Sequence, residues 1–224
     1  YHLLASNQKD RWIKALSNEF VRLAQGNIHG INHTDTIDFI FKSDVPKNKK
    51  VTYATFVCDH RTLKSDPWRV RCVVGGDKLP FPFNTSSPAA SMIDTKIMIN
   101  SVISDAHRGA RFLAADLKDF FLGSKMKTPE YMRIPYDIFP QDIIDKYNLA
   151  EKVCEEGYIY IKIKKGMYGL KQAAILAYKQ LVNHLKPFGY SPVPHSLSLW
   201  THATRKTKFC LCVDDFGVKY YMKD

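Results

Sequence analysis

Apolar residues in the first third of the chain change from helical spacing to strand spacing. Between residues 10 and 25 they recur every three or four positions, which predicts an amphipathic helix that ends at Gly26. Segments 36–42 and 51–58 are short apolar and β-branched runs on either side of a lysine-rich turn, and each predicts a strand. Segment 68–74 alternates, which predicts a strand with one apolar face and one face that presents arginines.

Two further helices are predicted from helical spacing. The first covers 87–109, with Ser87 as its N-cap, Pro88 in its first turn and Gly109 after its end. The second covers 172–186, where apolar side chains form one stripe and a proline and a glycine follow.

The remaining strand signals lie in the second half of the chain. Short apolar or alternating runs predict strands at 110–117 and 158–164 and a hairpin at 208–221. Segment 128–150 contains three prolines, which predict irregular structure. Helices packed beside hairpins indicate the α+β class.

Two neighbouring carboxylates, Asp214 and Asp215, stand at the turn of the last hairpin. Turn chemistry alone explains Asp and Gly at such a place. Adjacent carboxylates also repel each other, however, and a divalent cation such as Mg²⁺ relieves that repulsion. A third carboxylate, Asp116, ends the strand at 110–117, where the alternative interpretation is a cap of the following helix. Carboxylates from separate strands, together with cationic side chains, are what two-metal phosphoryl transfer requires.

The net charge of the chain indicates a class of binding partner. The chain has 224 residues, a formal net charge of +11 and a pI of about 9.3. A folded chain this basic usually binds a polyanion, and nucleic acid is the leading candidate. The alternative is a basic surface with no special partner.

The cysteines indicate reduced thiols. There are five, an odd number without a C-x-x-C pair, which argues against a disulfide framework and for an intracellular setting. Cys210 and Cys212 share one face of a strand and are expected to be small core residues. The eight histidines form no zinc-ligand spacing, and no apolar run reaches the length of a membrane span.

Several blocks of the sequence together resemble the reverse transcriptase domain of copia-type LTR retrotransposons. The similarity runs in order over roughly residues 11–220. The blocks are W-I-K-A-L-S-N-E, W-R-V-R-C-V-V-G-G, A-D-L-K-D-F-F-L-G, E-Y-M-R-I-P, K-G-M-Y-G-L-K-Q-A and C-V-D-D. Cys212 stands where the family usually has tyrosine, and Ala174 where it usually has proline.

The resemblance implies a polymerase fingers-and-palm fold, in which helices back an antiparallel palm sheet. Residues 1–224 would form one interleaved fragment. The fingers would comprise mainly 36–90 and 128–172, and the palm mainly 91–127 and 173–224. A thumb is expected to be absent, because the chain stops soon after the last hairpin.

The resemblance also implies roles for nine residues. Asp116, Asp214 and Asp215 would be the catalytic carboxylates that bind the metal ions. Arg69 and Arg71 would hold the triphosphate, and Phe121 would be the steric gate against a ribose 2′-hydroxyl. The other implied nucleotide-binding residues are Tyr168, Gly169 and Lys171. Each of Arg69, Arg71, Phe121 and Tyr168 also has a plain structural interpretation, as an exposed strand face or as packing.

The implied activity is RNA-directed DNA polymerisation by nucleotidyl transfer from a dNTP to a primer 3′-hydroxyl. Two Mg²⁺ ions would serve as cofactors, with Mn²⁺ as a substitute. The implied partners are dNTPs, an RNA or DNA template with its primer, and the thumb, RNase H and integrase of a parent Pol polyprotein, with no membrane. The setting would be a cytoplasmic particle or the nucleus. The alternative is a truncated, non-catalytic retrotransposon remnant that only binds nucleic acid, which Cys212 and Ala174 favour.

Overall fold

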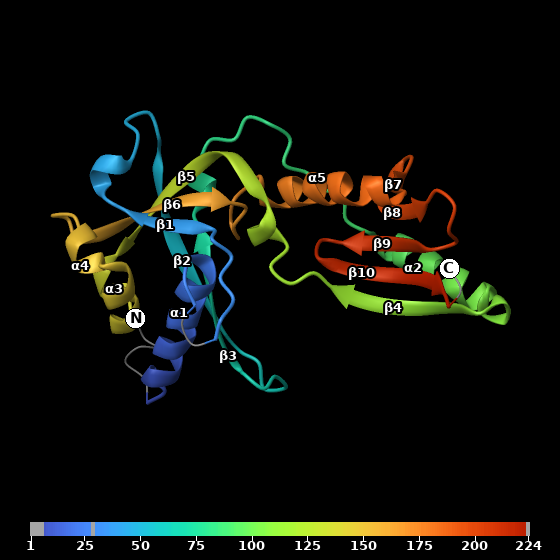
Figure 1. Ribbon diagram of the computed structural model, residues 1–224, viewed down its shortest axis with the longest axis horizontal. Helices are drawn as coiled ribbons and strands as arrows, with labels where there is room; N and C mark the ends of the chain where they lie inside the picture. Colours follow the sequence, from blue (N-terminus) through green and yellow to red (C-terminus); the bar gives the residue numbers. More distant parts are fainter. Residues whose placement is uncertain (1–6, 28–29, 223–224) are drawn as a thin grey trace. The chain divides into compact units, whose positions relative to one another are not determined.

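The computed structural model describes residues 7–27 and 30–222, which form two compact units (Figure 1). Among these residues, unit 1 comprises 7–27, 30–82 and Phe121–Ala173, and unit 2 comprises Phe83–Phe120 and 174–222. Along the chain, the two segments of unit 1 therefore alternate with the two segments of unit 2. The names fingers and palm for parts of the chain stay a prediction.

Unit 1 is a mixed five-stranded sheet with helices. Its strands lie in the order β1-β6-β5-β2-β3, and every neighbouring pair is antiparallel except β2 with β5. The helices are α1 (Lys9–Leu23), α3 (Gln141–Tyr147) and α4 (Leu149–Lys152), with short 3-10 turns η2 (Lys42–Asp44), η3 (Gly76–Lys78), η5 (Phe121–Gly123) and η6 (Tyr136–Ile138). The strands are β1 (Ile37–Ile40), β2 (Val51–His60), β3 (Trp68–Val74), β5 (Lys125–Pro135) and β6 (Tyr158–Lys165).

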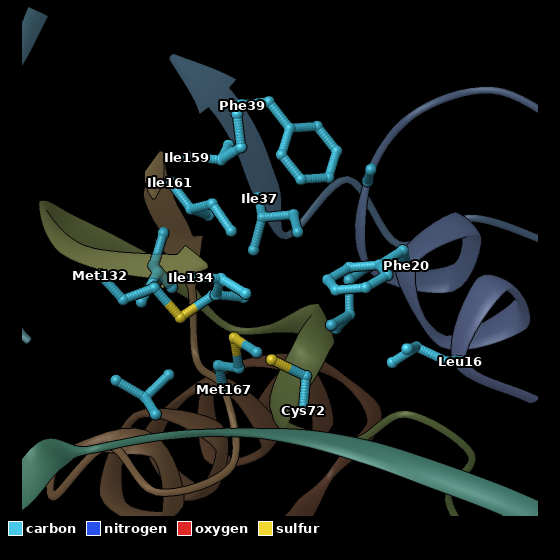
Figure 2. Close-up of a cluster of buried hydrophobic side chains, with 14 of the residues drawn as sticks. Leu16, Phe20, Ile37, Phe39, Cys72, Met132, Ile134, Ile159, Ile161 and Met167 are labelled. Carbon is cyan, nitrogen blue, oxygen red and sulfur yellow. The ribbon is translucent and has the colours of Figure 1, made fainter. Parts of the chain in front are cut away.

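The core of unit 1 forms where α1 meets the sheet. Figure 2 shows Phe20 of α1 among side chains from β1, β5 and β6, and Phe20 and Ile161 have no exposed surface. The Phe20 ring also packs 4.7 Å from that of Phe139, between ring centroids. Burial of such large apolar side chains stabilises the unit by roughly 1.5–3 kcal/mol each.

Helix α1 also covers the edge of the sheet at β3. The buried carboxylate of Glu19 accepts a hydrogen bond from the backbone N–H of Cys72 at 2.9 Å, and Arg22 binds the other oxygen of that carboxylate at 2.6 Å. A further edge N–H, that of Val74, donates to the carbonyl of Tyr168. Strand β3 is thus fixed at two points of its outer edge.

Unit 2 is an antiparallel five-stranded sheet in the order β4-β10-β9-β8-β7 (Figure 1). Lys219 of β10 binds α2 on one face, whereas Phe209 and Leu211 of β9 pack with α5 residues on the other. Its strands are β4 (Ala110–Asp116), β7 (Tyr190–Val193), β8 (Ser196–His202), β9 (Lys208–Cys212) and β10 (Asp215–Tyr221). Its helices are α2 (Met92–Ser104) and α5 (Ala173–Leu185), with 3-10 turns η4 (Ala106–Arg108) and η7 (Lys186–Phe188).

The predicted α+β class, with sheets backed by helices, is confirmed. The predicted start of the second helix was wrong, because α2 begins after Ser91 rather than Ser87. Strand β5 was also missed, since three prolines argued against it. The bounds of α1, β3, β6 and α5 lie within two residues of those predicted. In the part of the chain that the structure describes, no helix is both long enough and apolar enough to cross a bilayer.

Candidate functional site

Strand register in unit 2 brings two of the predicted carboxylates together. Asp116, the last residue of β4, lies directly opposite Asp215, the first residue of β10. Directly opposed residues in an antiparallel pair project to the same face, with Cβ atoms about 4.5–5.5 Å apart. Both aspartates are exposed. Two anionic side chains therefore stand side by side at one end of the sheet.

Asp214 occupies the tight turn between β9 and β10. Cys212 pairs with Asp215, so Val213 and Asp214 alone form the turn. The backbone carbonyl of Asp214 accepts a hydrogen bond of 2.9 Å from the N–H of Leu117, the residue after Asp116. This bond fixes the turn to the end of β4.

The turn holds an unusual backbone conformation. Val213 has φ of 62°, the left-handed region that β-branched residues avoid. A two-residue hairpin loop with positive φ at its first position normally uses glycine there. Such strain costs roughly 1–3 kcal/mol and tends to occur at functional sites. The pairing of β9 with β10 and the hydrogen bond from Leu117 hold Val213 in this conformation.

The carboxylates suit a hard cation, although they do not form a closed cage. Within residues 7–27 and 30–222, no three His, Cys, Asp or Glu side chains gather as a group able to hold a metal ion. Mg²⁺ is normally bound through one or two carboxylates together with substrate phosphates rather than by protein ligands alone. The Asp116–Asp215 pair fits that mode of binding. Cys212, expected in the core, is exposed instead and lies opposite Asp215, whereas Cys210 is buried as expected.

The predicted cationic residues gather in unit 1. Burial lowers the pKa of Arg69 from its ordinary value, and the positive charges of Arg71 and Arg61 lower it further. Asp59 lies directly opposite Arg69 on β2, but within the described ranges no carboxylate comes within 4.0 Å of the Arg69 guanidinium. Half-buried like charges without a bound counter-ion are unfavourable, so this cluster is suited to an anion.

Arg71 is held over an aromatic ring. Its guanidinium carbon lies 5.0 Å from the centroid of the Tyr168 ring, and the Phe121 ring meets Tyr168 edge-on at 5.7 Å. The buried Nε of Arg71 has no hydrogen-bond partner among the described residues. Phe121 also packs against the hydrophobic core of unit 1, in agreement with its structural interpretation as a packing residue. Arg71, Tyr168 and Phe121 thus form one chain of contacts, a cation over a ring and two rings that meet edge-on.

Gly169 allows the turn that carries Tyr168 to approach β3. Its φ is +91°, and an added Cβ would lie 2.0 Å from the carbonyl oxygen of Val74. Only glycine fits this position. Lys171 follows in the same turn and donates to the carbonyl of Leu79 at 3.0 Å. Lys171 therefore anchors the segment after η3, a role that the sequence did not indicate.

Arg61 is a member of the cationic cluster that sequence reasoning missed. It lies in the turn between β2 and β3, where its N–H bonds to the carbonyl of Pro67. Its buried Nε, like that of Arg71, lacks a hydrogen-bond partner in the described part of the chain. The feature that could have identified Arg61 is the β2–β3 hairpin, because the pairing of His60 with Trp68 brings Arg61 near Arg69.

Comparisons with models of protein families, with curated proteins and with solved structures give no match to this chain.

Proposed function

We propose that this chain is a reverse transcriptase domain, an RNA-directed DNA polymerase of the copia-type retrotransposon class. The observation that carries the proposal is the register of β4 with β10, which sets Asp116 opposite Asp215 beside the Asp214 turn. The half-buried arginine cluster of unit 1 adds support, because a triphosphate is the anion that such a polymerase binds.

Each predicted residue has a role in this proposal. Asp116, Asp214 and Asp215 supply the carboxylates. Two Mg²⁺ ions, for which Mn²⁺ can substitute, would activate the attacking oxygen and stabilise the leaving one. The primer 3′-hydroxyl would lose its proton to solvent as its oxygen forms a bond to the α-phosphorus of the dNTP. The bond from that phosphorus to the oxygen bridging the β-phosphate would break, and pyrophosphate would leave.

The side chains of unit 1 act on the incoming nucleotide. Arg69 and Arg71 neutralise the triphosphate as its negative charge shifts toward the leaving pyrophosphate. The edge-on contact of Phe121 with Tyr168 supplies an aromatic wall, and discrimination against a ribose 2′-hydroxyl would depend on this wall. Gly169 and Lys171 act as positioning residues, since both fix the turn that carries Tyr168.

Incorporation of dTMP into a primer tests the proposal. The protein is mixed in excess with a poly(rA)/oligo(dT) hybrid, Mg²⁺ and dTTP, so that weak grip on the hybrid does not limit the result. We expect incorporation that falls at least about a hundredfold in Asp116→Asn and in Asp214→Asn, because each change removes a metal-binding charge. Asp10→Asn, an exposed carboxylate of α1, is the matched control and should leave the rate unchanged.

One observation favours a second candidate function, a non-catalytic module that binds nucleic acid. The described carboxylates do not gather as a metal-holding group. This alternative predicts that the hybrid binds but that no dTTP is incorporated by any variant. Equal incorporation by the unmutated chain and by Asp214→Asn would contradict the polymerase proposal.

A further inference from the structure

Helix α2 of unit 2 turns its polar side to the sheet and its apolar side to solvent. The helix lies against the sheet at β4, β9 and β10 (Figure 1). Met98 of this helix is buried, but five large apolar side chains of the same helix are exposed: Met92, Ile93, Ile97, Ile99 and Ile103. A helix at the surface of a globular protein normally has the opposite arrangement, with its apolar stripe against the core.

Specific hydrogen bonds hold α2 in this orientation. Near the start of the helix, the carboxylate of Asp94 accepts hydrogen bonds from the hydroxyls of Ser196 and Ser198 in β8, at 3.4 Å each. Near its end, the carbonyl and hydroxyl of Ser101 accept hydrogen bonds from Lys219 of β10. Rotation of the helix to bury its apolar side would break these contacts, so that side stays outward.

The exposed apolar side of α2 is large for a surface patch. Met92, Ile93 and Ile103 are 70%, 69% and 66% exposed. Together with Ile97 and Ile99 they present roughly 600 Å² of side chain to water, the upper end of what a monomer usually shows in one apolar patch. A stable interface buries about 800 Å² on each partner, so this side of α2 supplies most of one.

The order of residues in α2 favours a second copy of the chain as the partner. Ile93 and Ile103 lie five positions before and after Met98, and Ile97 and Ile99 lie one position before and after it. When two copies of a helix pack antiparallel about a two-fold axis level with Met98, each position meets its mirror position on the other copy. Isoleucine then meets isoleucine at both pairs of positions.

The same arrangement accommodates the charge on this side of the helix. Lys96 is the charged residue among the exposed residues of α2. Lys96 and Asn100 lie two positions before and after Met98, so the second helix brings each Lys96 beside Asn100 of the other copy. The ammonium group can donate a hydrogen bond that the amide oxygen accepts. A single charge offers little to a partner recognised by its acidic groups.

We propose that the chain forms a two-fold symmetric dimer in which the exposed apolar side of α2 packs antiparallel against the same side of α2 in a second copy. Each copy covers the five apolar side chains of the other. The proposal does not depend on polymerisation, because it rests only on residues of unit 2.

Sedimentation equilibrium tests the dimer. The protein is studied over a range of micromolar concentrations in about 0.5 M salt, which removes bound nucleic acid. We expect twice the chain mass of 25.7 kDa. Ile97→Glu combined with Ile103→Glu should give a monomer, because the dimer would bury unpaired carboxylates. Leu63→Glu combined with Leu197→Glu is the matched control at two exposed apolar residues outside α2, and it should stay dimeric.

A mixture of two variants tests the antiparallel arrangement. Ile93→Lys and Ile103→Glu each place a charge against an isoleucine of the other copy, and each alone should weaken the dimer at least tenfold. An equimolar mixture should associate at least tenfold more tightly than either variant alone. In the mixed dimer the introduced ammonium and carboxylate meet, and the second contact between Ile93 and Ile103 is intact. Circular dichroism melting confirms that all variants fold.

Three results would overturn the proposal in solution. They are a monomer at every concentration, a dimer that persists in Ile97→Glu with Ile103→Glu, and a mixture that associates no better than its components. Binding of a monomeric chain to phosphatidylcholine vesicles, lost in Ile97→Glu with Ile103→Glu, would also overturn it, because a lipid surface would then cover α2.

Discussion

A single glycine decides whether the turn that carries Tyr168 can lie against β3. Gly169 and Gly157 both have positive φ, +91° and +77°, but only Gly169 is crowded by neighbouring backbone. Alanine substitutions at the two positions therefore separate two free-energy costs, that of the left-handed backbone conformation and that of a steric clash.

We predict that Gly169→Ala lowers the free energy of unfolding by at least about 2 kcal/mol, because strain and a clash with Val74 add together. Gly157→Ala should cost only about 1 kcal/mol, since a Cβ there meets nothing within 4 Å. Urea denaturation measures both. Equal losses would show that the turn moves away from β3 at little cost.

At the residue scale, sequence reasoning placed Cys210 correctly and Cys212 wrongly. Strand alternation puts both on one face, but burial along that face ends at the turn, where only solvent covers Cys212. The strained φ of Val213 was likewise invisible, because valine gives no turn signal.

At the element scale, helix α2 shows how a tertiary contact sets a helix boundary. Both Ser87 and Ser91 can cap a helix. Ser91 forms the capping box with Asp94, whose carboxylate accepts the Ser91 N–H in return. The N–H of Ala90 donates to the carbonyl of Leu211 in β9, which holds the preceding residues outside the helix.

The other end of α2 is fixed to β10 by an ion pair. Buried Lys219 donates to the carbonyl and hydroxyl of Ser101 and to Asp105. The hydrogen bonds from Lys219 and Tyr221 lower the pKa of Asp105 to about 2. A carboxyl whose pKa is lower in the folded state stabilises the fold above about pH 4, and this contribution is lost as pH falls toward 2.

We therefore predict that Asp105→Asn makes the free energy of unfolding less dependent on pH between about 4 and 2. At pH 7 the variant should be less stable than the unmutated protein, because buried Lys219 loses its anionic partner. Denaturant unfolding at pH 2, 3, 4 and 7 measures this, with Asp10→Asn as control. An unchanged pH profile in Asp105→Asn would contradict the assignment.

Three strands, β5, β7 and β8, escaped prediction, and prolines interrupt the first two. In β5, Pro129 falls in the irregular segment between the paired residues Lys125 and Glu130, where no ladder bond is lost. Strand β7 lies at the edge of its sheet, where Pro192 is tolerated. Pattern alone cannot show which positions of a strand are unpaired.

At the scale of the whole molecule, each unit has its own hydrophobic core. Ile161 belongs to the core of unit 1 and has no exposed surface, whereas Trp200 and Phe209 form the centre of unit 2. The chain crosses between the units three times, so neither core is formed by one continuous segment.

We predict that Ile161→Ala lowers the free energy of unfolding of unit 1 by about 2–5 kcal/mol, through lost burial and a residual cavity. Hydrogen exchange should show the largest loss of protection in β5 and β6, and a smaller one in β9. Leu63→Ala, at a residue 98% exposed, is the control and should change nothing. Equal loss of protection in β6 and β9 would mean that the two cores unfold together.

The sequence by itself determined the α+β class, the long helices and alternating strands, the basic charge and the candidate side chains, because periodicity and composition are local properties. Only tertiary structure decided which of these residues meet. Strand register sets Asp116 opposite Asp215, and the β2–β3 hairpin brings Arg61 to Arg69. Such pairings join residues far apart in the chain, and no local pattern encodes them.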